Sequence, residues 1–512
     1  MPKPNKPQSS KNPAQNRQQT RPAAPVSSPY RTRPAQPGQS TATKPAQSRP
    51  ARSQPTRPKA AAGLGVNPSR SNATTASTRQ VSRSPEPPQK LKLPVPSAAV
   101  SRRASELLRA GHVWVYASEV EQTELGPGPA PALIPVVDNR GIPLGTALYS
   151  AASQIVLRMV SRDLLKEEAW LRLLDLRLRA AIQRRKPLLD AQTNACRLVF
   201  SEADELPGLI VDKYAGIVVI QLLAKGLDTA QTRDVCIQAL SEELPGDLTI
   251  WERPDPRIRE LEGLSAPAAT PLYARSAPIA QTTFHLNGLS FHFDVNSGQK
   301  TGAFLDQRQN YAAAAAWAQT RGVKKALDVC TYQGGFALHL AQVCETVIGI
   351  DASRASLEVA ERNIELNTSQ LKAPVDWVEG DAFEILRGWS AASESKLDSA
   401  TKTSESGEPW DLIVLDPPAF AKSKRAVEGA LRGYKELNLR ALRMLRPGGL
   451  LITCSCSHHV SWAELESTVA SAAIDAHRRV TLLERRGAAQ DHPVILNLPE
   501  TEYLKCLICQ VD

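Results

Sequence analysis

The chain has 512 residues, of which 62 are Lys or Arg, 52 are Asp or Glu and 42% are hydrophobic. This length allows two to four domains with buried cores, and no window reaches the roughly 18 consecutive apolar residues that a membrane span needs. Eight cysteines in so long a chain do not indicate a disulfide framework, so we expect a reducing, cytoplasmic setting.

The positive charge is concentrated in residues 1–90. This segment holds 16 Lys and Arg against one acid, Glu86, which leaves 46 basic and 51 acidic residues for 91–512. It is rich in Pro, Ser, Gln and Arg and has no apolar periodicity, so we predict a disordered tail. The tail is either a solvated spacer or an arm that attracts RNA, and its Ser/Arg richness leaves an organelle address open.

A small β-rich domain is predicted over residues 91–165. It contains a helix over 101–110, an alternating strand "VWVYASEV", a hairpin around the turn at 139–141 and a strand "QIVLRMVS". A second region, 166–290, combines several strands with two helices. This combination predicts a small α+β domain in the middle of the chain, with its helices over 166–189 and 229–244.

Strands and helices alternate from residue 324 onward. The strands are "KKALDVC", "TVIGID", "VDWVEGDA", "DLIVLDPP" and "LLITCSC". Such alternation is typical of a parallel, doubly wound α/β sheet, and a closing pair of strands without a helix between them predicts an antiparallel edge. We assign 291–512 to this domain and interpret the polar, low-complexity stretch 391–408 as a surface loop.

The first three strands of this domain end in residues that suit a nucleotide-like ligand. Ligands of doubly wound sheets bind at the carboxyl ends of strands, and Gly334 and Gly335 supply a tight turn there. Asp351 could accept hydrogen bonds from ribose hydroxyls, and Asp381 could meet an adenine edge. The spacing G-x-G-x-x-G is absent, which disfavours a dinucleotide. Glycines and acids that only cap strands and helices are the alternative.

The fourth strand ends in Asp416-Pro417-Pro418, with Phe420 close behind. Prolines fix φ and donate no N–H group, so carbonyl oxygens at this corner stay available to a planar substrate. An aromatic ring adds a stacking face. We expect Asp416 to point into the crevice beside the reactive end of the cofactor, where the corner suits a nucleobase next to a methyl donor.

The fifth strand places Cys454 and Cys456 two residues apart, with Cys456 at the carboxyl end. Carbon 5 of a pyrimidine is a poor nucleophile until a thiolate adds to carbon 6. We therefore predict Cys456 as the nucleophile, with Asp416 hydrogen-bonding the base or assisting its protonation. Cys506 and Cys509 would face opposite sides of a strand, which disfavours zinc. The remaining cysteines are predicted to be small buried apolar residues: Cys196, Cys236, Cys330 and Cys344.

Taken together, the motifs resemble the large-subunit ribosomal RNA methyltransferase I family. The matching segments run in family order: "GHVWVYASEV", "SEADELPGLIVDKY", "QKTGAFLDQR", "YQGGFALHLA", "DPPAFAKSK", "RGYKELNLRAL", "CSCS", "DHPV" and "EYLK". The resemblance implies cytosine-5 methylation of large-subunit ribosomal RNA with S-adenosyl-L-methionine as cofactor. It also implies an RNA-binding PUA domain, a central domain and a class I, Rossmann-like methyltransferase domain. No membrane partner or metal is expected, and a homodimer is left open.

The resemblance also implies a set of site residues, with Cys456 and Asp416 as the catalytic pair. The segment "TGAFLDQR" would line the methionine end of the cofactor. The cofactor set is Phe304, Asp306, Gln307, Arg308, Asp328, Gly334, Gly335, Asp351, Asp381, Ala382 and Asp416. The substrate set is Pro417, Pro418, Phe420, Lys422, Arg432 and Tyr434. The chain departs from the family pattern in its basic tail, its insertion, and the residues Ala303 and Gln333.

Other chemistries share parts of this pattern. Guanine-N7 methylation uses nearly the same Asp-Pro-Pro-x-Phe corner but needs no thiol, because N7 is already nucleophilic. Methylation of an exocyclic amino group would leave Cys456 without a role. Uracil-5 methylation shares the thiolate route and stays open. A non-catalytic RNA-binding protein on the same fold is disfavoured by the full set of strand-end acids together with Cys456.

Overall fold

A computed structural model of the chain describes residues 93–298, 301–397 and 409–512. The predicted tail and residues 398–408 of the predicted surface loop lie outside these ranges. In the described residues, no helix combines the length and hydrophobicity needed to cross a membrane. The prediction of a loop over 391–408 is wrong at its start, because residues 391–397 continue helix α8 (Ala382–Leu397). Their sequence, "AASESKL", contains mostly residues that a helix tolerates well.

The β-rich domain contains a six-stranded sheet in the order β2-β6-β5-β4-β1-β3. The predicted helix and hairpin are both present. The predicted strand "VWVYASEV" is instead split by a 3₁₀ turn over Ala117–Glu119, in which the Tyr116 N–H donates to the Glu119 carboxylate at 3.2 Å. The two halves therefore lie at opposite edges of the sheet. The elements are β1 (Ser97–Val100), α1 (Arg102–Arg109), β2 (Trp114–Tyr116), β3 (Val120–Glu124), β4 (Leu133–Val137), β5 (Pro143–Tyr149) and β6 (Ile155–Ser161).

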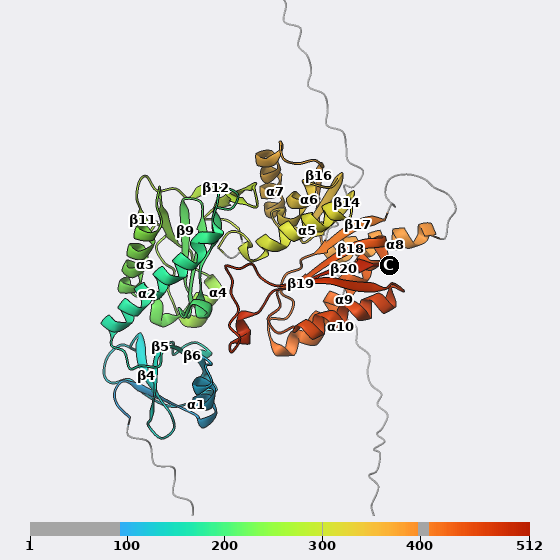
Figure 1. Cartoon of the computed structure of the whole chain (residues 1–512). Helices are drawn as coiled ribbons and strands as arrows, with labels where there is room; N and C mark the ends of the chain where they lie inside the picture. The colour runs from blue at the N-terminus through green and yellow to red at the C-terminus, as the bar shows by residue number, and fades with distance from the viewer. Residues whose placement is uncertain (1–92, 299–300, 398–408) are drawn as a thin grey trace, which may run out of the picture. The chain divides into compact units, whose positions relative to one another are not determined.

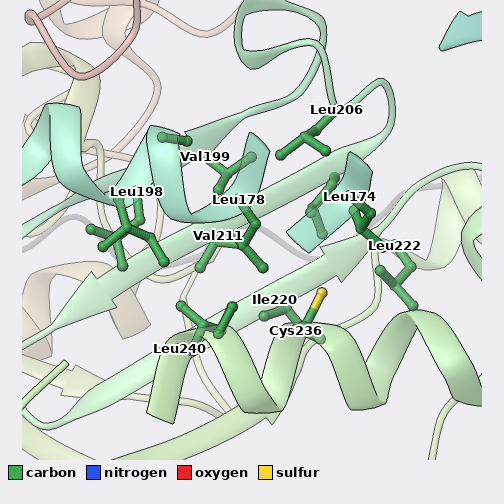
Figure 2. Close-up of a cluster of buried hydrophobic side chains, with 14 of the residues drawn as sticks. Leu174, Leu178, Leu198, Val199, Leu206, Val211, Ile220, Leu222, Cys236 and Leu240 are labelled. Atoms are coloured by element: carbon green, nitrogen blue, oxygen red, sulfur yellow. The ribbon is translucent and has the colours of Figure 1, made fainter. Parts of the chain in front are cut away.

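The central region contains a five-stranded sheet in the order β11-β10-β9-β8-β7. Leu174 and Leu178 of α2 and Cys236 and Leu240 of α3 belong to one buried cluster with residues of β7, β8 and β9, as Figure 2 shows. The predicted boundary at residue 290 falls inside the hairpin β12–β13. The elements are α2 (Glu167–Arg185), β7 (Ala195–Phe200), β8 (Leu209–Tyr214), β9 (Ile217–Leu222), α3 (Ala230–Glu243), β10 (Thr249–Glu252), α4 (Pro256–Glu262), β11 (Tyr273–Ala274), β12 (Gln281–Leu286) and β13 (Leu289–Asp294).

The third region is built on a seven-stranded sheet in the order β16-β15-β14-β17-β18-β20-β19. The first five strands of this order are mutually parallel, and β20 is antiparallel to both neighbours, which confirms the predicted antiparallel edge. The strands are β14 (Lys325–Val329), β15 (Thr346–Asp351), β16 (Val375–Glu379), β17 (Trp410–Leu415), β18 (Leu445–Ser455), β19 (Val480–Arg486) and β20 (Lys505–Val511).

Helices cover both faces of this sheet (Figure 1). Successive strand residues alternate between two buried clusters: Ile413 packs with α9 and α10, whereas Leu412 packs with α5 and α6. The predicted doubly wound α/β architecture is thus confirmed, and the carboxyl ends of β14 to β18 meet at one edge. The helices are α5 (Arg308–Thr320), α6 (Gly335–Ala341), α7 (Arg354–Asn367), α8, α9 (Val427–Met444) and α10 (Trp462–Asp475).

Candidate active site

A cavity of about 340 Å³ lies at the carboxyl ends of the parallel strands. It is bounded by the loops that follow β14, β15, β16, β17 and β18 and by the short turn η5 (Leu305–Gln307) before α5. Ligands of doubly wound sheets bind at this edge. The predicted site residues that line the cavity are Phe304, Asp306, Gln307, Asp351, Asp381, Ala382, Asp416, Pro417, Pro418, Phe420 and Cys456.

Three members of the predicted cofactor set shape the turn after β14 without lining the cavity. Fully buried Asp328 accepts hydrogen bonds from the Thr331 hydroxyl at 2.5 Å and the backbone N–H of Ala337 at 2.9 Å, and burial raises its pKa to about 7. Gly334 has φ of +87°, and a Cβ on Gly335 would lie 2.5 Å from the Tyr311 ring. The turn therefore needs all three residues to bring the following backbone to the cavity.

Asp351 and Asp381 both line the cavity and both order the loop beside them. Asp351 accepts the backbone N–H groups of Tyr332 and Ser353, each at 2.9 Å. Oδ1 of Asp381 accepts the N–H groups of Phe383 and Glu384 at the start of α8, at 2.8 and 3.1 Å. Each carboxylate thus caps a local structure and also presents negative charge to a ligand.

The charge of the cavity lining suits a cationic nucleoside. Within the described residues, the lining contains four carboxylates and no Lys or Arg: Asp306, Asp351, Asp381 and Asp416. S-adenosylmethionine carries a sulfonium and an ammonium, together with ribose hydroxyls and an adenine amino group, all of which carboxylates bind favourably. A dinucleotide would instead bring the negative charge of a pyrophosphate into this acidic cavity. The residues present therefore fit S-adenosylmethionine better than a dinucleotide.

A relay of side-chain amides holds Asp416 in place. Nε2 of Gln307 donates to Oδ1 of Asp416 at 2.9 Å, and Oε1 of Gln307 accepts from Nδ2 of Asn310 at 2.6 Å. Oδ1 of Asn310 in turn accepts from Nε of Arg486 on β19, at 3.0 Å. Because each amide is bonded at both ends, its orientation is fixed, and Gln307 can only donate to Asp416. Asp416 is thereby presented to the cavity as a hydrogen-bond acceptor.

The segment between β19 and β20 supports the turn η5. The Tyr503 hydroxyl donates to Oδ2 of Asp306 at 2.5 Å, and the Asp306 carbonyl accepts the N–H of Ala489 at 2.8 Å. Burial and the Asp306 carboxylate raise the pKa of Tyr503, which keeps this donor protonated. Arg308 does not line the cavity, since its guanidinium lies 3.4 Å from the buried carboxylate of Asp491.

Cys456 follows the last residue of β18 and lies against the proline corner. Its Sγ is 3.9 Å from the carbonyl oxygen of Pro417. Tyr434 does not line the cavity, but it supports the contact between Cys456 and the proline corner. Its hydroxyl is 2.9 Å from the hydroxyls of both Ser455 and Ser457. The Ser457 hydroxyl also accepts the N–H of Ala421 at 3.1 Å. These bonds join the loop after β17 to the loop after β18.

The other predicted substrate residues are divided between the cavity and the surface. Phe420 lies in the cavity wall, with its ring centroid 4.8 Å from that of Tyr434. Lys422 is exposed, and Arg432 is exposed with its guanidinium 2.6 Å from Glu428. Neither basic side chain lines the cavity, so any contact they make with a substrate lies outside it.

Three of the four cysteines that were predicted to be buried are buried: Cys196, Cys236 and Cys344. Cys454 is buried opposite Cys506 in the β18–β20 pairing, and Cys506 and Cys509 belong to clusters on opposite faces of the sheet. The prediction that Cys330 is simply buried is wrong: it is half-buried and lines the cavity, with φ of +63°. The tight turn after β14 forces this backbone conformation and turns the residue toward the cavity.

Known proteins match this chain over nearly all of its described length. A model of PUA-like domains matches residues 99–162, and one of S-adenosylmethionine-dependent methyltransferases matches 206–492. The ribosomal RNA large subunit methyltransferase I of Erwinia tasmaniensis is 36% identical over 411 residues, 80% of this chain and 97% of the relative. That of Photobacterium profundum is 34% identical over 407 residues, 79% and 96% of the two chains. The chain belongs to the ribosomal RNA large subunit methyltransferase I family.

Solved structures agree with this family at the level of the fold. A methyltransferase solved in complex with SAH has a TM-score of 0.65 at 21% identity and covers 81% of this chain and 99% of its own. A second, from Streptococcus mutans, has a TM-score of 0.64 at 20% identity, with the same coverage. The chain is thus a PUA-like domain followed by a Rossmann-like methyltransferase that depends on S-adenosylmethionine.

Several cavity residues of this methyltransferase were not predicted from the sequence. Thr331 and Tyr332 follow β14, and their backbone reaches the cavity because of the turn described above. Leu504 precedes β20, in the segment "EYLK", to whose side chains the sequence assigns no role. The position of a glycine turn was a usable signal for the first pair. The pairing of β20 with β18, which brings "EYLK" to the cavity, was not readable from the sequence.

Proposed function

We propose that this protein transfers a methyl group from S-adenosylmethionine to carbon 5 of a cytosine in large-subunit ribosomal RNA. The named relatives support large-subunit ribosomal RNA as the substrate. One observation supports carbon 5: the Cys456 thiol lines the same cavity as Asp416 and lies 3.9 Å from the Pro417 carbonyl oxygen. Methylation at N7 or at an exocyclic amino group needs no thiol, so either reaction would leave Cys456 without a role.

One end of the cavity would hold the cofactor and the other end the base that is methylated. S-adenosylmethionine supplies an electrophilic methyl group on a sulfonium. Asp351 and Asp381 would accept hydrogen bonds from the ribose hydroxyls and the adenine amino group, while Asp306 and Gln307 would face the methionine end. The base would then lie against the proline corner and Cys456, with Phe420 beside its face.

The chain's own groups account for the steps at the base. The Cys456 thiolate forms a bond from Sγ to carbon 6, and the displaced electron pair makes carbon 5 nucleophilic. Asp416, fixed by Gln307, accepts a hydrogen bond from the exocyclic amino group of the cytosine and holds the base in position for attack. After carbon 5 has gained the methyl group, its proton leaves to a base, the Sγ–C6 bond breaks, and the thiolate is restored.

The decisive experiment is methyl transfer from labelled S-adenosylmethionine to unmodified large-subunit RNA, with nucleoside analysis of the product. We expect 5-methylcytosine from the wild type and a loss of at least about 10³-fold with Cys456→Ala. A substrate with 5-fluorocytosine should form a denaturant-stable complex with the wild type, because fluorine cannot leave from carbon 5 as a proton does.

Cys454→Ala is the matched control, since Cys454 is buried two residues away and does not line the cavity. It should retain activity within a few-fold and still form the 5-fluorocytosine complex. A product methylated at N7 or at an amino group, or full activity in Cys456→Ala, would contradict the proposal. Formation of 5-methyluridine would keep the thiolate route and change the base.

A further inference from the structure

Strand β20 brings a buried lysine beside the proposed nucleophile. Lys505 is 2% exposed and stands opposite Ser455 in the pairing of β18 and β20, one residue before Cys456. Its Nζ donates a hydrogen bond to the carbonyl oxygen of Ser457 at 3.2 Å, on the other side of Cys456. The lysine is therefore tied to the two residues that flank Cys456 in the chain.

The buried ammonium of Lys505 has few hydrogen-bond acceptors and few charge partners. An ammonium has three donors, and the backbone carbonyl of Ser457 is its one hydrogen-bond acceptor among the described residues, which also offer it no ion pair. Burial lowers the pKa of Lys505, while Glu502, Cys456 and Glu464 act in the opposite direction. Burying a charge with so few partners is costly, and such groups concentrate at functional sites.

The other charged groups near Cys456 do not favour a thiolate. Asp306 and Asp416 line the same cavity, and carboxylates disfavour a second negative charge. The phenols of Tyr434 and Tyr503 are held by neighbouring hydroxyl and carboxylate groups. Two arginines near the cavity are paired with carboxylates, Arg197 with Asp212 and Arg308 with Asp491. His458 lies among the charged or titratable groups of His459, Glu500, Lys424 and Lys505.

We propose that the Lys505 ammonium stabilises the thiolate form of Cys456 and so acts as a positioning residue for methyl transfer. The Cys456 proton is lost to water, and the ammonium keeps its own protons and forms no bond with the substrate. Its charge offsets that of the thiolate, and its bond to the Ser457 carbonyl holds the turn on which Cys456 lies. The role of the thiolate in catalysis rests on the proposed function, but its stabilisation can be measured without RNA.

The test is the pH dependence of Cys456 alkylation in the full chain. Iodoacetamide reacts with the thiolate, and peptide mass spectrometry separates Cys456 from the other cysteines. In Lys505→Met we expect the midpoint of the alkylation rate to rise by about one pH unit and the rate at pH 7 to fall about tenfold. Lys505→Arg, which keeps the charge, should restore much of the rate.

Two controls separate this effect from damage to the fold. Lys213→Met removes a half-buried lysine that donates to the carbonyls of Asn194 and Ala215 in the central region, and it should leave the midpoint unchanged. Thermal unfolding and SAH affinity report whether each variant is intact. An unshifted midpoint in a folded, SAH-binding Lys505→Met protein would overturn the inference. A shifted midpoint would support it even if Cys456→Ala still methylated RNA, in which case the proposed function alone would fail.

Discussion

Two halves of the cavity are held together by different kinds of contact. One half, formed by the loops after β14, β15 and β16, is the proposed cofactor half. Its carboxylates accept backbone N–H groups close by in the chain or on the adjacent loop, such as that of Ser353 by Asp351 and that of Phe383 by Asp381. The other half, formed by the loops after β17 and β18, is the proposed substrate half, and its side chains bond partners far away in sequence. Gln307 to Asp416 spans 109 residues, and Ala421 to Ser457 spans 36.

This difference separates binding from chemistry. The cofactor half depends on turns that each form from a few consecutive residues, so a single substitution there should change the affinity for S-adenosylmethionine without moving the substrate half. The substrate half needs several distant elements in register before Asp416 and Cys456 face each other. Changes in its network should therefore reduce turnover or stability and leave cofactor affinity nearly intact.

The largest effect is expected at Asp416 in the substrate half. Asp416→Asn removes the negative charge at the proposed position of the base, and we expect kcat for methyl transfer to fall by on the order of 10³-fold. Asp411→Asn is the matched control, because Asp411 lies near the opposite end of β17 and accepts the backbone N–H groups of Lys324 and Lys325. It should lower the melting temperature and spare kcat. Similar kcat values for the two variants would contradict the division of the cavity into a cofactor half and a substrate half.

The turn after β14 is expected to give the cofactor half a pH dependence. The pKa of Asp328 is about 7 in the fold, above its ordinary value of 3.8, because of burial. The folded state thus holds a proton that the unfolded state has lost, so the contribution of Asp328 to the free energy of unfolding is largest below pH 4 and is lost as the pH rises through 7. Asp328→Asn cannot titrate. Between pH 5 and 8 the wild type should lose on the order of 3 kcal/mol of unfolding free energy through Asp328, and the variant should not lose it. Denaturant unfolding at several pH values measures this difference.

A more moderate effect is expected at Asp351. Asp351→Ala removes the acceptor of two backbone N–H groups and a carboxylate at the proposed ribose site, and we expect the Kd for SAH to rise about 10- to 30-fold by calorimetry. Asp376→Ala, on the exposed face of β16, should leave this Kd unchanged. RNA affinity should be the same in both variants, and a parallel loss of RNA binding would show that the two halves are not independent.

The smallest effect is expected from Tyr434→Phe. This change deletes one hydroxyl that bonds Ser455 and Ser457, and should lower the free energy of unfolding by about 1 kcal/mol. It should also reduce kcat a few-fold, because the turn at Cys456 loses a support, while the Kd for SAH stays constant. A rise in that Kd comparable to the loss in kcat would break the proposed separation of the halves.

The two halves also differ in how well the sequence predicts them. The order of strands and helices, the antiparallel edge and the acids at strand ends follow from local periodicity and from residues next to their own turns. Asp351 and Asp381 were placed in this way. The sequence did not predict that Arg308 would face Asp491 or that Tyr434 would support the Cys456 turn from below, because their partners lie far away in the chain.

A second limit comes from residues whose role depends on a neighbouring strand. Lys505 and Leu504 acquire their positions only through the pairing of β20 with β18, and Cys330 reaches the cavity only through a backbone with positive φ. Periodicity describes which face of a strand a residue occupies but not which strand lies beside it. Family resemblance supplied the segment "EYLK" without saying what its side chains do.

The antiparallel strand β20 has a consequence for how the protein is made. It lies between β18 and β19, so both of these earlier strands await a partner that the ribosome synthesises after them. Until β20 is synthesised, β18 presents an open edge, the cavity lacks Leu504, and the turn at Cys456 lacks the lysine that bonds it. An open edge in a growing chain is a site for mispairing, so the nascent protein would benefit from chaperone protection at this stage. The proposed catalytic residues therefore reach their final arrangement late in synthesis, when β20 pairs with β18 and β19.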